Sequence, residues 1–547
     1  MFEAISQQRR ALVGARSAPA GASRSAVVSR RSLLRWGSVA AGGATLAGLG
    51  LGAAPAALAA EAPLTTLRTR LAPTQAAVAV ALVNDPVAHL LRRATFGATP
   101  ATVAAARALG TAAWLEQQLQ PALLPDPVCD ALLQRWPTLT MTARQIEAAA
   151  PSSGSWWAQR ELVDSTLARA AWSERQLLEV MVEFWSNHFH GTTPSSDVWS
   201  TKTVDDREVI RPNALGSFTT MLLASAKSPA MLAYLGNALS KASAPNENYG
   251  RELLELHTVG IGAGFTEADV KASARALTGW TTDANLLFVF YPDWHATGPL
   301  TVLGWSSANT RADGVAVGES YLRYLAAHPA TAQHLAHKLC VRFVADAPPA
   351  ALVQRLAQVY LTSGTQIAPV LRALFASPEF AASTGAKQRR PLEDLVATLR
   401  VLNIKPAATG TAGPNQLTWI AEQLSQAPLG WGPPNGYPDV APAWRSTAGT
   451  LGRWNWHLSL ANGNWPAELT YPGVRALLIG PPPLTCGDLV DRLSAALVLQ
   501  TLPTRERTAV LGFLGGAESA APTTDQLTSG LPYLVALILD TPTWRQR

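Results

Sequence analysis

The chain has 547 residues, of which 48% are hydrophobic and 15% charged, and this composition excludes wholesale disorder because it can build a sizeable buried core. It carries 44 Lys and Arg against 38 Asp and Glu, but residues 1–60 hold seven arginines and one acid, so the rest of the chain is neutral. A neutral body has no general electrostatic footprint for DNA or RNA, and we expect no nucleic-acid partner.

The first 60 residues are predicted to be an export signal. The twin arginines Arg30 and Arg31 precede a Gly- and Ala-rich apolar run at 39–58, with small residues at Ala57, Ala59 and Ala60. This order resembles a twin-arginine signal peptide with an A-x-A-like cleavage site. The run is long enough for a membrane anchor but only weakly hydrophobic, and no later stretch has ~18 uninterrupted apolar residues. We therefore expect a protein exported by this signal, periplasmic or extracellular, with no stable membrane span after cleavage.

Residues 61–84 are predicted to be a linker, and from Asp85 onward the pattern is helical. Asp85 suits a helix N-cap and Pro86 the first helical position. Thr99 and Pro100 predict the start of the next helix, which Gly110 ends.

A further helix is predicted to begin at Ser173, which stands three residues before Gln176 in capping-box spacing. Its apolar side chains repeat at helical spacing, and similar patterns recur toward the C-terminus. Only residues 286–292 have clear strand character, and they are expected to form a hairpin with residues 299–304.

These patterns predict a mainly α fold, a large multi-helix domain with a minor β-hairpin and a long Pro/Gly/aromatic loop at 406–450. We expect a helical core domain at 85–465 and a C-terminal helical extension at 466–547 packed on the core. The loop aromatics Trp431, Tyr437 and Trp444 either bind a partner or a sugar by stacking, or serve only to make the loop rigid.

The three cysteines are scattered at Cys129, Cys340 and Cys486. This spacing makes neither a disulfide framework nor a CxxC metal site, and whether one pair joins after export is open.

The segment 246–260, NENYGRELLELHTVG, concentrates charge in a chain that has little. Asn246 suits an N-cap, and Glu247, Arg251 and Glu255 form two i,i+4 steps of a salt-bridge ladder. Gly260 ends this helix. The following GIGAG does not match a phosphate-binding loop, so a turn between helices is the preferred interpretation.

His257 has two readings that the segment alone leaves open. It either caps the negative end of the helix dipole, or joins Glu252 or Glu255 as a metal ligand or acid–base group. The spacing matches neither HExxH nor the Glu-x-x-His of di-iron bundles. His188 shares a helical stripe with apolar residues and is expected to be buried, where an imidazole needs hydrogen bonds, a carboxylate or a metal.

Several longer motifs resemble the bacterial domain-of-unknown-function 1800 family. They are, in chain order, HLLRRATFG, FWSNHF, RPNALGSF, PNENYGRELLELHTVG, ARALTGW, HPATAQHLAHKLCVRF and PPNGYP, between about residues 85 and 460. The resemblance implies a helical, exported protein with a second exported protein encoded nearby as a partner, and it implies no particular activity.

The family motifs map onto a defined set of residues of this chain, namely Asn246, Glu247, Asn248, Tyr249, Arg251, Glu252, Glu255, His257, Thr258, His188, Arg275, Gly279 and Trp280. One departure is visible after the predicted strand. Members usually carry a His-Asp pair and a lysine there, whereas this chain keeps His295 but has Ala296 and Leu300 at the other two positions.

Two hypotheses from different classes follow, and the sequence does not choose between them. The first is an exported enzyme, with hydrolysis of an envelope or extracellular substrate as the leading reaction and oxidation at iron as the next. Its catalytic residues would be Glu252, Glu255, His257 and His188. Of these, His188, Glu252 and His257 would hold a divalent metal, Zn, Mn or Fe. Substrate would be bound by Arg251, Arg275, Tyr249, Asn248 and Trp280.

The second hypothesis is a non-catalytic scaffold or binding subunit of an exported complex. The carboxylates and arginine of residues 247–255 would then be a buried network that fixes helix packing.

Overall fold

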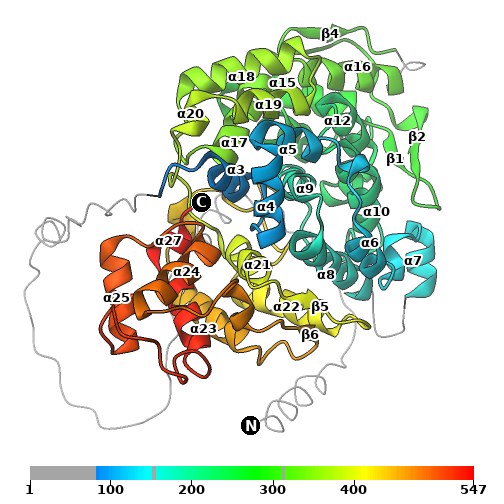
Figure 1. The fold of residues 1–547 in the computed structure, drawn as a ribbon. Coiled ribbons are helices and arrows are strands. Elements are labelled where there is room, and N and C mark those ends of the chain that lie inside the picture. Colours follow the sequence, from blue (N-terminus) through cyan, green and yellow to red (C-terminus); the bar gives the residue numbers. More distant parts are fainter. Residues whose placement is uncertain (1–81, 151–155, 311–313) are drawn as a thin grey trace, which may run out of the picture. The chain divides into compact units, whose positions relative to one another are not determined.

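The computed structural model describes residues 82–150, 156–310 and 314–547, and the predicted signal peptide and most of the predicted linker lie outside them (Figure 1). All the described residues belong to one compact unit. The fold is mainly α, as predicted, and the strands of the described residues form three two-stranded antiparallel sheets. Among the described helices, none is long and apolar enough to cross a lipid bilayer.

The elements before the first sheet are helices and short helical turns. They are α3 (Pro86–Ala94), α4 (Pro100–Leu109), α5 (Thr111–Gln118), η1 (Pro121–Leu123), α6 (Pro127–Leu133), η2 (Pro137–Leu139), α7 (Ala143–Ala149), α8 (Trp156–Trp172), α9 (Gln176–His188), α10 (Lys202–Asp205), η3 (Asp206–Ile210), α11 (Arg211–Asn213), α12 (Phe218–Lys227), α13 (Pro229–Tyr234), η4 (Asn237–Leu239), α14 (Glu247–Glu252), η5 (Leu253–His257), η6 (Ile261–Ala263) and α15 (Glu267–Ala276).

The central part of the chain holds two sheets followed by a run of helices. Its elements are β1 (Trp280–Thr282), β2 (Phe288–Phe290), η7 (Pro292–Trp294), β3 (Leu300–Val302), β4 (Trp305–Ser307), α16 (Gly314–Ala326), α17 (Pro329–Phe343), α18 (Ala350–Thr362), α19 (Ile367–Phe375), α20 (Pro378–Ala381) and α21 (Pro391–Val401).

The C-terminal part is again mostly helical. Its elements are β5 (Lys405–Pro406), α22 (Ala412–Gln423), η9 (Ala441–Trp444), α23 (Thr447–Asn462), β6 (Leu469–Thr470), η10 (Val474–Leu477), α24 (Cys486–Val498), α25 (Thr504–Leu514), α26 (Leu531–Leu539) and α27 (Pro542–Arg545).

The helix starts predicted near the N-terminus are confirmed. The Asp85 carboxylate accepts hydrogen bonds from the backbone N–H of Val87 and Ala88, at 2.9 and 3.1 Å. Thr99 caps α4, and Gly110 follows it with φ +78°, a backbone conformation that glycine adopts without strain. The start predicted at Ser173 is wrong by a few residues. Helix α9 begins at Gln176, and the Ser173 hydroxyl donates to the Asp126 carboxylate (2.6 Å) and accepts from the backbone N–H of Arg175 (3.0 Å), which precedes the helix.

The predicted hairpin is also wrong in its pairing. Strand β2 pairs with β1, and β3 pairs with β4. Leu303 and Gly304, at φ +48° and +91°, join β3 to β4. Such a two-residue turn with positive φ at both positions returns the chain directly on itself, so β3 meets its immediate successor.

The loop predicted at 406–450 is shorter than expected. Residues 412–423 form α22, and α23 begins at Thr447 with Ser446 as its N-cap. What remains is an ordered segment at 424–446 with one short helical turn, η9, and we call it the aromatic loop. The three cysteines are buried and unpaired.

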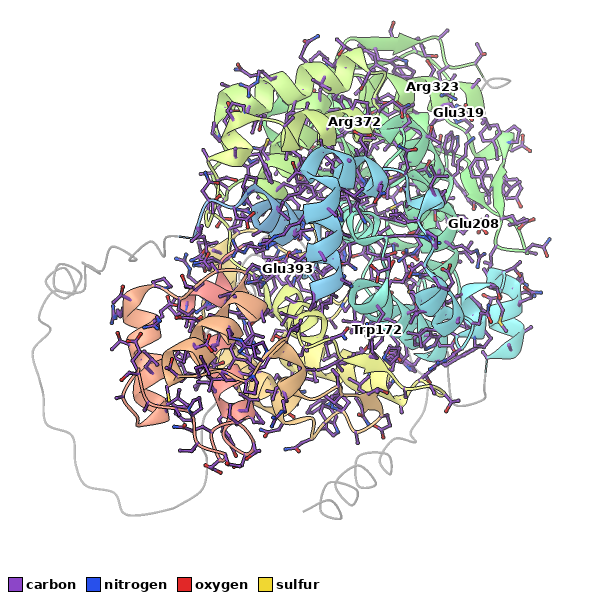
Figure 2. All side chains as sticks on the ribbon, in the orientation of Figure 1. Trp172, Glu208, Glu319, Arg323, Arg372 and Glu393 are labelled. Atoms are coloured by element: carbon purple, nitrogen blue, oxygen red, sulfur yellow. The ribbon has the colours of Figure 1, made fainter. Side chains whose placement is uncertain are left out.

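Helix α21 lies inside the protein, and all eleven of its residues are buried. Gly97, just after α3, lies so close to this helix that a Cβ there would stand 2.7 Å from the Ala397 Cα. A helix that is buried all round is expected to be apolar, yet this one carries Glu393, Asp394 and Arg400. Figure 2 shows Glu393 among the packed helices, whereas the half-exposed Glu208 lies toward the edge of the view.

Each charge on α21 has partners from other parts of the chain. Arg400 donates to the carbonyl oxygens of Gly97 and Ala171, the latter at 2.8 Å. Asp394 accepts a hydrogen bond from the indole of Trp544 on α27 (2.5 Å) and lies 3.4 Å from His457 Nε2 on α23. The C-terminal helices, orange and red in Figure 1, thus contact the buried helix directly. The domain boundary predicted at residue 465 stays a prediction.

His457 lies between two carboxylates, Asp394 and Asp540, with Nδ1 2.7 Å from Asp540. Burial alone would lower the pKa of His457, but the two carboxylates outweigh it and raise this pKa to about 9 from 6.5. A pKa raised by folding contributes stability that is complete below pH 6.5 and is lost as the pH rises through 9.

We therefore expect His457→Gln to lower the free energy of unfolding more at pH 6 than at pH 10. With about 1.4 kcal/mol per pKa unit, the difference between the two pH values should be on the order of 3 kcal/mol. Urea denaturation of both proteins at each pH measures it. A loss that is the same at both pH values would show that His457 is not charged in the folded protein.

Candidate functional site

The charged segment 246–260 folds as a capped helix that ends in a π-turn. Asn246 accepts hydrogen bonds from the backbone N–H of Asn248 and Tyr249, which confirms it as the N-cap of α14. The helix then continues as the π-turn η5, which ends at His257. Gly260 follows three residues later with φ +81°. π-Turns inside helices are found frequently at functional sites, and this one ends at His257.

His257 lies inside the protein beside His188, the last residue of α9. Their ring centroids are 6.1 Å apart, and a third ring, that of His334 on α17, lies 6.2 Å from His188. His188 and His257 are each 1% exposed. The structure therefore brings together the two histidines that the sequence singled out, and adds His334, which it did not. We call these three residues the histidine cluster.

Lys338 joins the histidine cluster from α17, one helical turn after His334. Its ammonium donates to His188 Nδ1 at 3.0 Å. Because His188 Nδ1 accepts this bond, the proton of a neutral His188 lies on Nε2, which donates to the His257 carbonyl at 3.1 Å. Both nitrogens of His188 are thus engaged, and the ring holds the amine of Lys338 in place.

All four groups have pKa values displaced toward the neutral form. Burial, helped by the nearby charge of Lys338, lowers the pKa of His257 to about 3 and that of His334 to about 4. The same two causes hold the pKa of His188 well below its usual range. Burial also lowers the pKa of Lys338 from 10.5 to about 8, against the opposing charge of Asp439. Such shifts are common at sites of proton transfer and nucleophilic attack.

Lys338 lines a pocket of about 300 Å³ between α9, α17 and the aromatic loop. We call it the lysine pocket. Most of the residues that line it carry polar side chains, namely Glu183, Asn187, His337, Asp346, Arg390, Asn435, Tyr437 and Asp439 besides Lys338. Phe184, Val341 and Val440 complete the wall, and apolar atoms make up the larger share of its exposed surface. A partly accessible amine of lowered pKa in a concavity with several polar side chains is the arrangement expected of a binding or catalytic site.

The aromatic loop is fastened over the lysine pocket by the end of α9. The Asn187 side chain accepts from the Tyr437 N–H (3.1 Å) and donates to the Glu183 carboxylate (2.7 Å). His190 Nε2 donates to the Trp431 carbonyl at 2.6 Å. At Gly436, φ is +69° and a Cβ would stand 2.2 Å from the Asn187 carbonyl oxygen, so the loop lies directly against the helix end.

The aromatic rings of the loop pack mainly against one another, at tilted angles. The ring centroid of Tyr437 lies 5.2 Å from that of Trp431 and 5.8 Å from that of Trp444. The Trp444 indole donates to the Pro438 carbonyl at 2.9 Å. These contacts favour the rigid-loop reading of the two alternatives for these residues.

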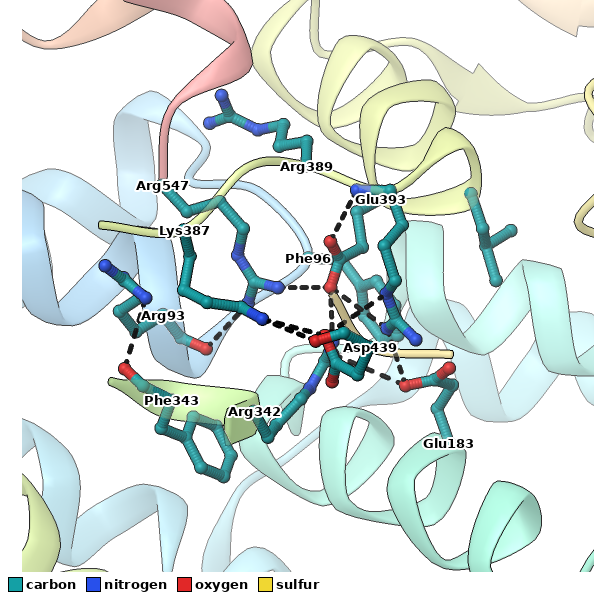
Figure 3. Close-up of polar contacts among 12 residues, drawn as sticks. Arg93, Phe96, Glu183, Arg342, Phe343, Lys387, Arg389, Glu393, Asp439 and Arg547 are labelled. Carbon is teal, nitrogen blue, oxygen red and sulfur yellow. Dashed lines mark hydrogen bonds and ion pairs between the residues drawn. The ribbon is translucent and has the colours of Figure 1, made fainter. Parts of the chain in front are cut away.

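A buried network of ion pairs lies beside the lysine pocket and supplies part of its wall. Figure 3 shows the contacts within this network. The network joins four basic side chains, Arg342, Lys387, Arg390 and Arg547, to four acidic ones, Glu183, Asp346, Glu393 and Asp439. Glu393 accepts from Arg390 (3.0 Å), Arg342 and Arg547, and Lys387 bridges Asp346 (2.6 Å) and Asp439 (3.2 Å). Positive and negative charges are equal in number, so the network as a whole is neutral.

The network is charged although it is buried. Burial alone would raise the pKa of Glu393, but the charges of Arg390, Arg547 and Arg342 outweigh it and hold this pKa well below its usual range. Asp439 behaves in the same way, with Arg390 and Lys387 as its strongest neighbours. Because Glu183, Arg390 and Asp439 also line the lysine pocket, the network sets the charge of its wall.

The two acidic residues predicted to be catalytic lie at the end of α14, which is Glu252, and in η5, which holds Glu255. Arg251 donates to Glu267 (2.9 Å) and lies 3.8 Å from Glu255, so one step of the predicted ladder is present and Glu267 completes the arrangement. The charge of Glu252 acts on Tyr234, whose pKa is raised first by burial. The catalytic roles predicted for Glu252 and Glu255 stay predictions.

The other residues predicted to bind substrate hold the fold around α14 and α15. Arg275 donates to the Thr297 carbonyl at 2.7 Å, and the Asn248 amide to the Leu235 carbonyl at 3.4 Å. Tyr249 and Trp280 are buried in the core. Of the described residues that line the lysine pocket, none is among these four or Arg251.

The predicted metal set of His188, Glu252 and His257 does not match the arrangement found. Among the described residues, no three His, Cys, Asp or Glu side chains are grouped so that they could hold one metal ion. In addition, both nitrogens of His188 are already engaged, by Lys338 and by the His257 carbonyl. His188, Glu252 and His257 therefore do not fit a divalent metal ion.

Several residues of the lysine pocket were missed from the sequence, Lys338 above all. The signal for it was present in HLAHK, where His334 and Lys338 stand four residues apart and therefore on one face of a helix. Glu183 stands 207 residues before Arg390, and Asp439 stands 49 residues after it, so no local spacing could have joined them.

Three segments that carried the family resemblance line this pocket, namely FWSNHF, HLAHKLCVRF and PPNGYP, and a fourth, PNENYGRELLELHTVG, places the His257 carbonyl against His188. A comparison with known families matches residues 89–546 to the family described as "Protein of unknown function (DUF1800)". The chain belongs to this family. The match continues well beyond residue 460, where the resemblance in the sequence was expected to end. Neither the search of curated proteins nor the search of solved structures found a match.

The ion network predicts a large effect of removing its central acid. We expect Glu393→Gln to lower the free energy of unfolding by about 3–5 kcal/mol, because three buried guanidinium groups lose their shared partner. Urea denaturation near pH 7 measures the loss. The control is Glu116→Gln, which breaks a pair with Arg372 that is 44% exposed on both sides and should cost less than about 1 kcal/mol. Equal losses in the two variants would contradict the role given to Glu393.

The close contact at Gly436 predicts that no side chain is tolerated there. We expect Gly436→Ala to destabilise the protein by at least about 2 kcal/mol, since it adds strain at positive φ to a clash with the backbone of Asn187. Gly432→Ala in the same loop is the control, because nothing lies within 4 Å of a Cβ at that position. Hydrogen exchange of residues 424–446 should rise in the first variant only. Unchanged exchange in Gly436→Ala would show that the loop is not held at this point.

Proposed function

We propose that this protein is an exported enzyme in which Lys338 transfers protons to or from a substrate bound in the lysine pocket. The observation that carries the proposal is the environment of the amine. It is partly accessible from a pocket with several polar side chains, is held by His188 at 3.0 Å, and has a pKa lowered to about 8. A lysine whose pKa is lowered toward neutrality is suited to act as a general base or as a nucleophile.

The roles of the neighbouring residues follow from their contacts. His188 is a positioning residue, because its two nitrogens link Lys338 to the backbone of His257. The charge of Asp439 opposes the lowering of the Lys338 pKa. With a pKa of about 8, roughly a tenth of the amine is neutral at pH 7, and this fraction rises tenfold by pH 9.

Hydrolysis is the reaction we favour. The neutral amine of Lys338 would take a proton from a water molecule in the pocket as the water oxygen bonds to the electrophilic atom of the substrate. The ammonium so formed would return a proton to the leaving group as the bond between that group and the attacked atom breaks. The polar side chains of the wall, with Asn435, Tyr437 and Asp346 among them, suit a substrate that is rich in hydrogen-bonding groups. Residues 1–60 would direct the protein to the periplasm or the exterior, where an envelope or extracellular substrate and a second exported protein are available.

A second candidate, a scaffold or binding subunit, is favoured by a different observation. The buried ion network is neutral and its members pair with one another, as expected of a device that fixes the packing of α9, α17 and α21. The scaffold hypothesis does not require the lowered pKa of Lys338.

Amine-selective labelling tests the proposal without knowledge of the substrate. Reductive methylation with formaldehyde proceeds through the neutral amine, so the labelling rate of Lys338 should reach half its maximum near pH 8. An ordinary lysine does so at about pH 10.4. Lys271, exposed on α15, is the internal control, and mass spectrometry resolves the two sites. A Lys338 that is labelled with the same pH profile as Lys271 would refute the proposal.

Turnover of a substrate provides the second arm of this test. Lys338→Met should lower kcat by about 10²–10⁴-fold, and Lys338→Arg should not restore it, because a guanidinium stays protonated. Both variants keep an unbranched stem in the same space. If both retained full turnover while the protein stayed folded, the catalytic role proposed for Lys338 would be refuted.

A further inference from the structure

A second, larger cavity shares one lining residue, Tyr437, with the lysine pocket. It has a volume of about 730 Å³. Its walls come from α8, from the end of α22, from residues 193–194 and from the start of the aromatic loop. We call it the tryptophan groove, because Trp156 and Trp157 stand side by side in its wall.

Trp156 offers the groove an apolar surface that nothing in the described structure covers. Its side chain is 59% exposed, a large fraction for an indole. Trp157 and Val163 extend the apolar wall, and Pro194 and Pro428 also line it. An exposed aromatic surface inside a concavity is more often a ligand contact than an accident of packing.

Charged and polar side chains lie beside this apolar wall. Arg160 donates to Glu422 (2.8 Å) and to the Asn415 carbonyl (2.6 Å), and its Nε lies 3.1 Å from Asp164. The Glu422 side chain is 46% exposed, so its carboxylate keeps acceptor positions open toward the groove. One guanidinium faces two carboxylates here, so the groove has no excess positive charge with which to attract an anion.

We propose that the tryptophan groove binds a neutral oligosaccharide and leads one of its sugar units past Tyr437 into the lysine pocket. A sugar ring combines an apolar C–H face, which packs on an indole, with edge hydroxyls, which donate to a carboxylate such as Glu422. This assignment rests on the proposed function only for turnover, and names the substrate class of that enzyme. An apolar ligand of the same volume would bury Arg160 and Glu422 without replacing their bonds to water.

Calorimetric titration with three neutral tetrasaccharides, cellotetraose, maltotetraose and chitotetraose, tests the binding directly. At least one of them should bind to the full chain. Trp156→Ala should weaken this binding at least tenfold, and Glu422→Gln should weaken it by a smaller factor. Trp454→Ala is the matched control, because Trp454 is 40% exposed on α23 and lines neither cavity, and it should bind as the wild type does.

The same titrations separate this inference from the proposed function. Lys338→Met should still bind the oligosaccharide, because the tryptophan groove is intact, while losing its turnover. Binding without turnover in the wild-type protein would refute the enzyme and leave the groove assignment standing. Failure of all three tetrasaccharides to bind, or binding that Trp156→Ala leaves unchanged, would overturn the groove assignment. Saturable binding in the groove of an uncharged apolar dye, N-phenyl-1-naphthylamine, in place of any sugar would overturn it too.

Discussion

The burial of charged side chains on α21 is the constraint on which the rest of this structure depends. A helix that is enclosed on every side can keep a carboxylate or a guanidinium only if other segments bring the opposite charge or enough carbonyl oxygens to it. Glu393 recruits arginines from α17, from the residue before α21 and from the end of the chain. Asp394 contacts Trp544 and His457. Arg400 donates hydrogen bonds to the carbonyl oxygens of Gly97, after α3, and of Ala171, near the end of α8. Segments far apart in sequence are thereby tied to one helix.

The lysine pocket exists because of this arrangement. The network that neutralises Glu393 extends through Arg390 to Glu183 and through Arg342 to Asp439, and these residues belong to α9 and to the aromatic loop. Asn187 and Gly436 then hold the loop against the end of α9. Lys338 is left beside three neutral histidines, where burial disfavours its charge more than Asp439 favours it. Structural and chemical features of the site therefore have one physical origin, the pairing of charges around a buried helix.

Much of the local structure could be predicted from the sequence, because its causes are local. The caps at Asp85, Thr99 and Asn246 depend on a side-chain oxygen and two or three neighbouring N–H groups, and all three are confirmed. The capping box expected at Ser173 is not formed, and the Gln176 side-chain oxygen that would have completed it accepts instead from the backbone N–H of Phe96, 80 residues earlier. The expected hairpin failed for a related reason, since the turn at Leu303 and Gly304 offered β3 a nearer partner.

For the candidate site, the sequence alone determined that His188 would be buried, that Asn246 would start the charged helix and that the fold would be mainly helical. These follow from spacing along one segment. Only the tertiary structure decided that Lys338 faces His188, that Glu267 of α15 pairs with Arg251, and that Glu183, Arg390 and Asp439 share one pocket wall. A pKa depends on every charge and on all the water excluded within several ångströms, and the residues that impose these conditions on Lys338 are brought together only by folding.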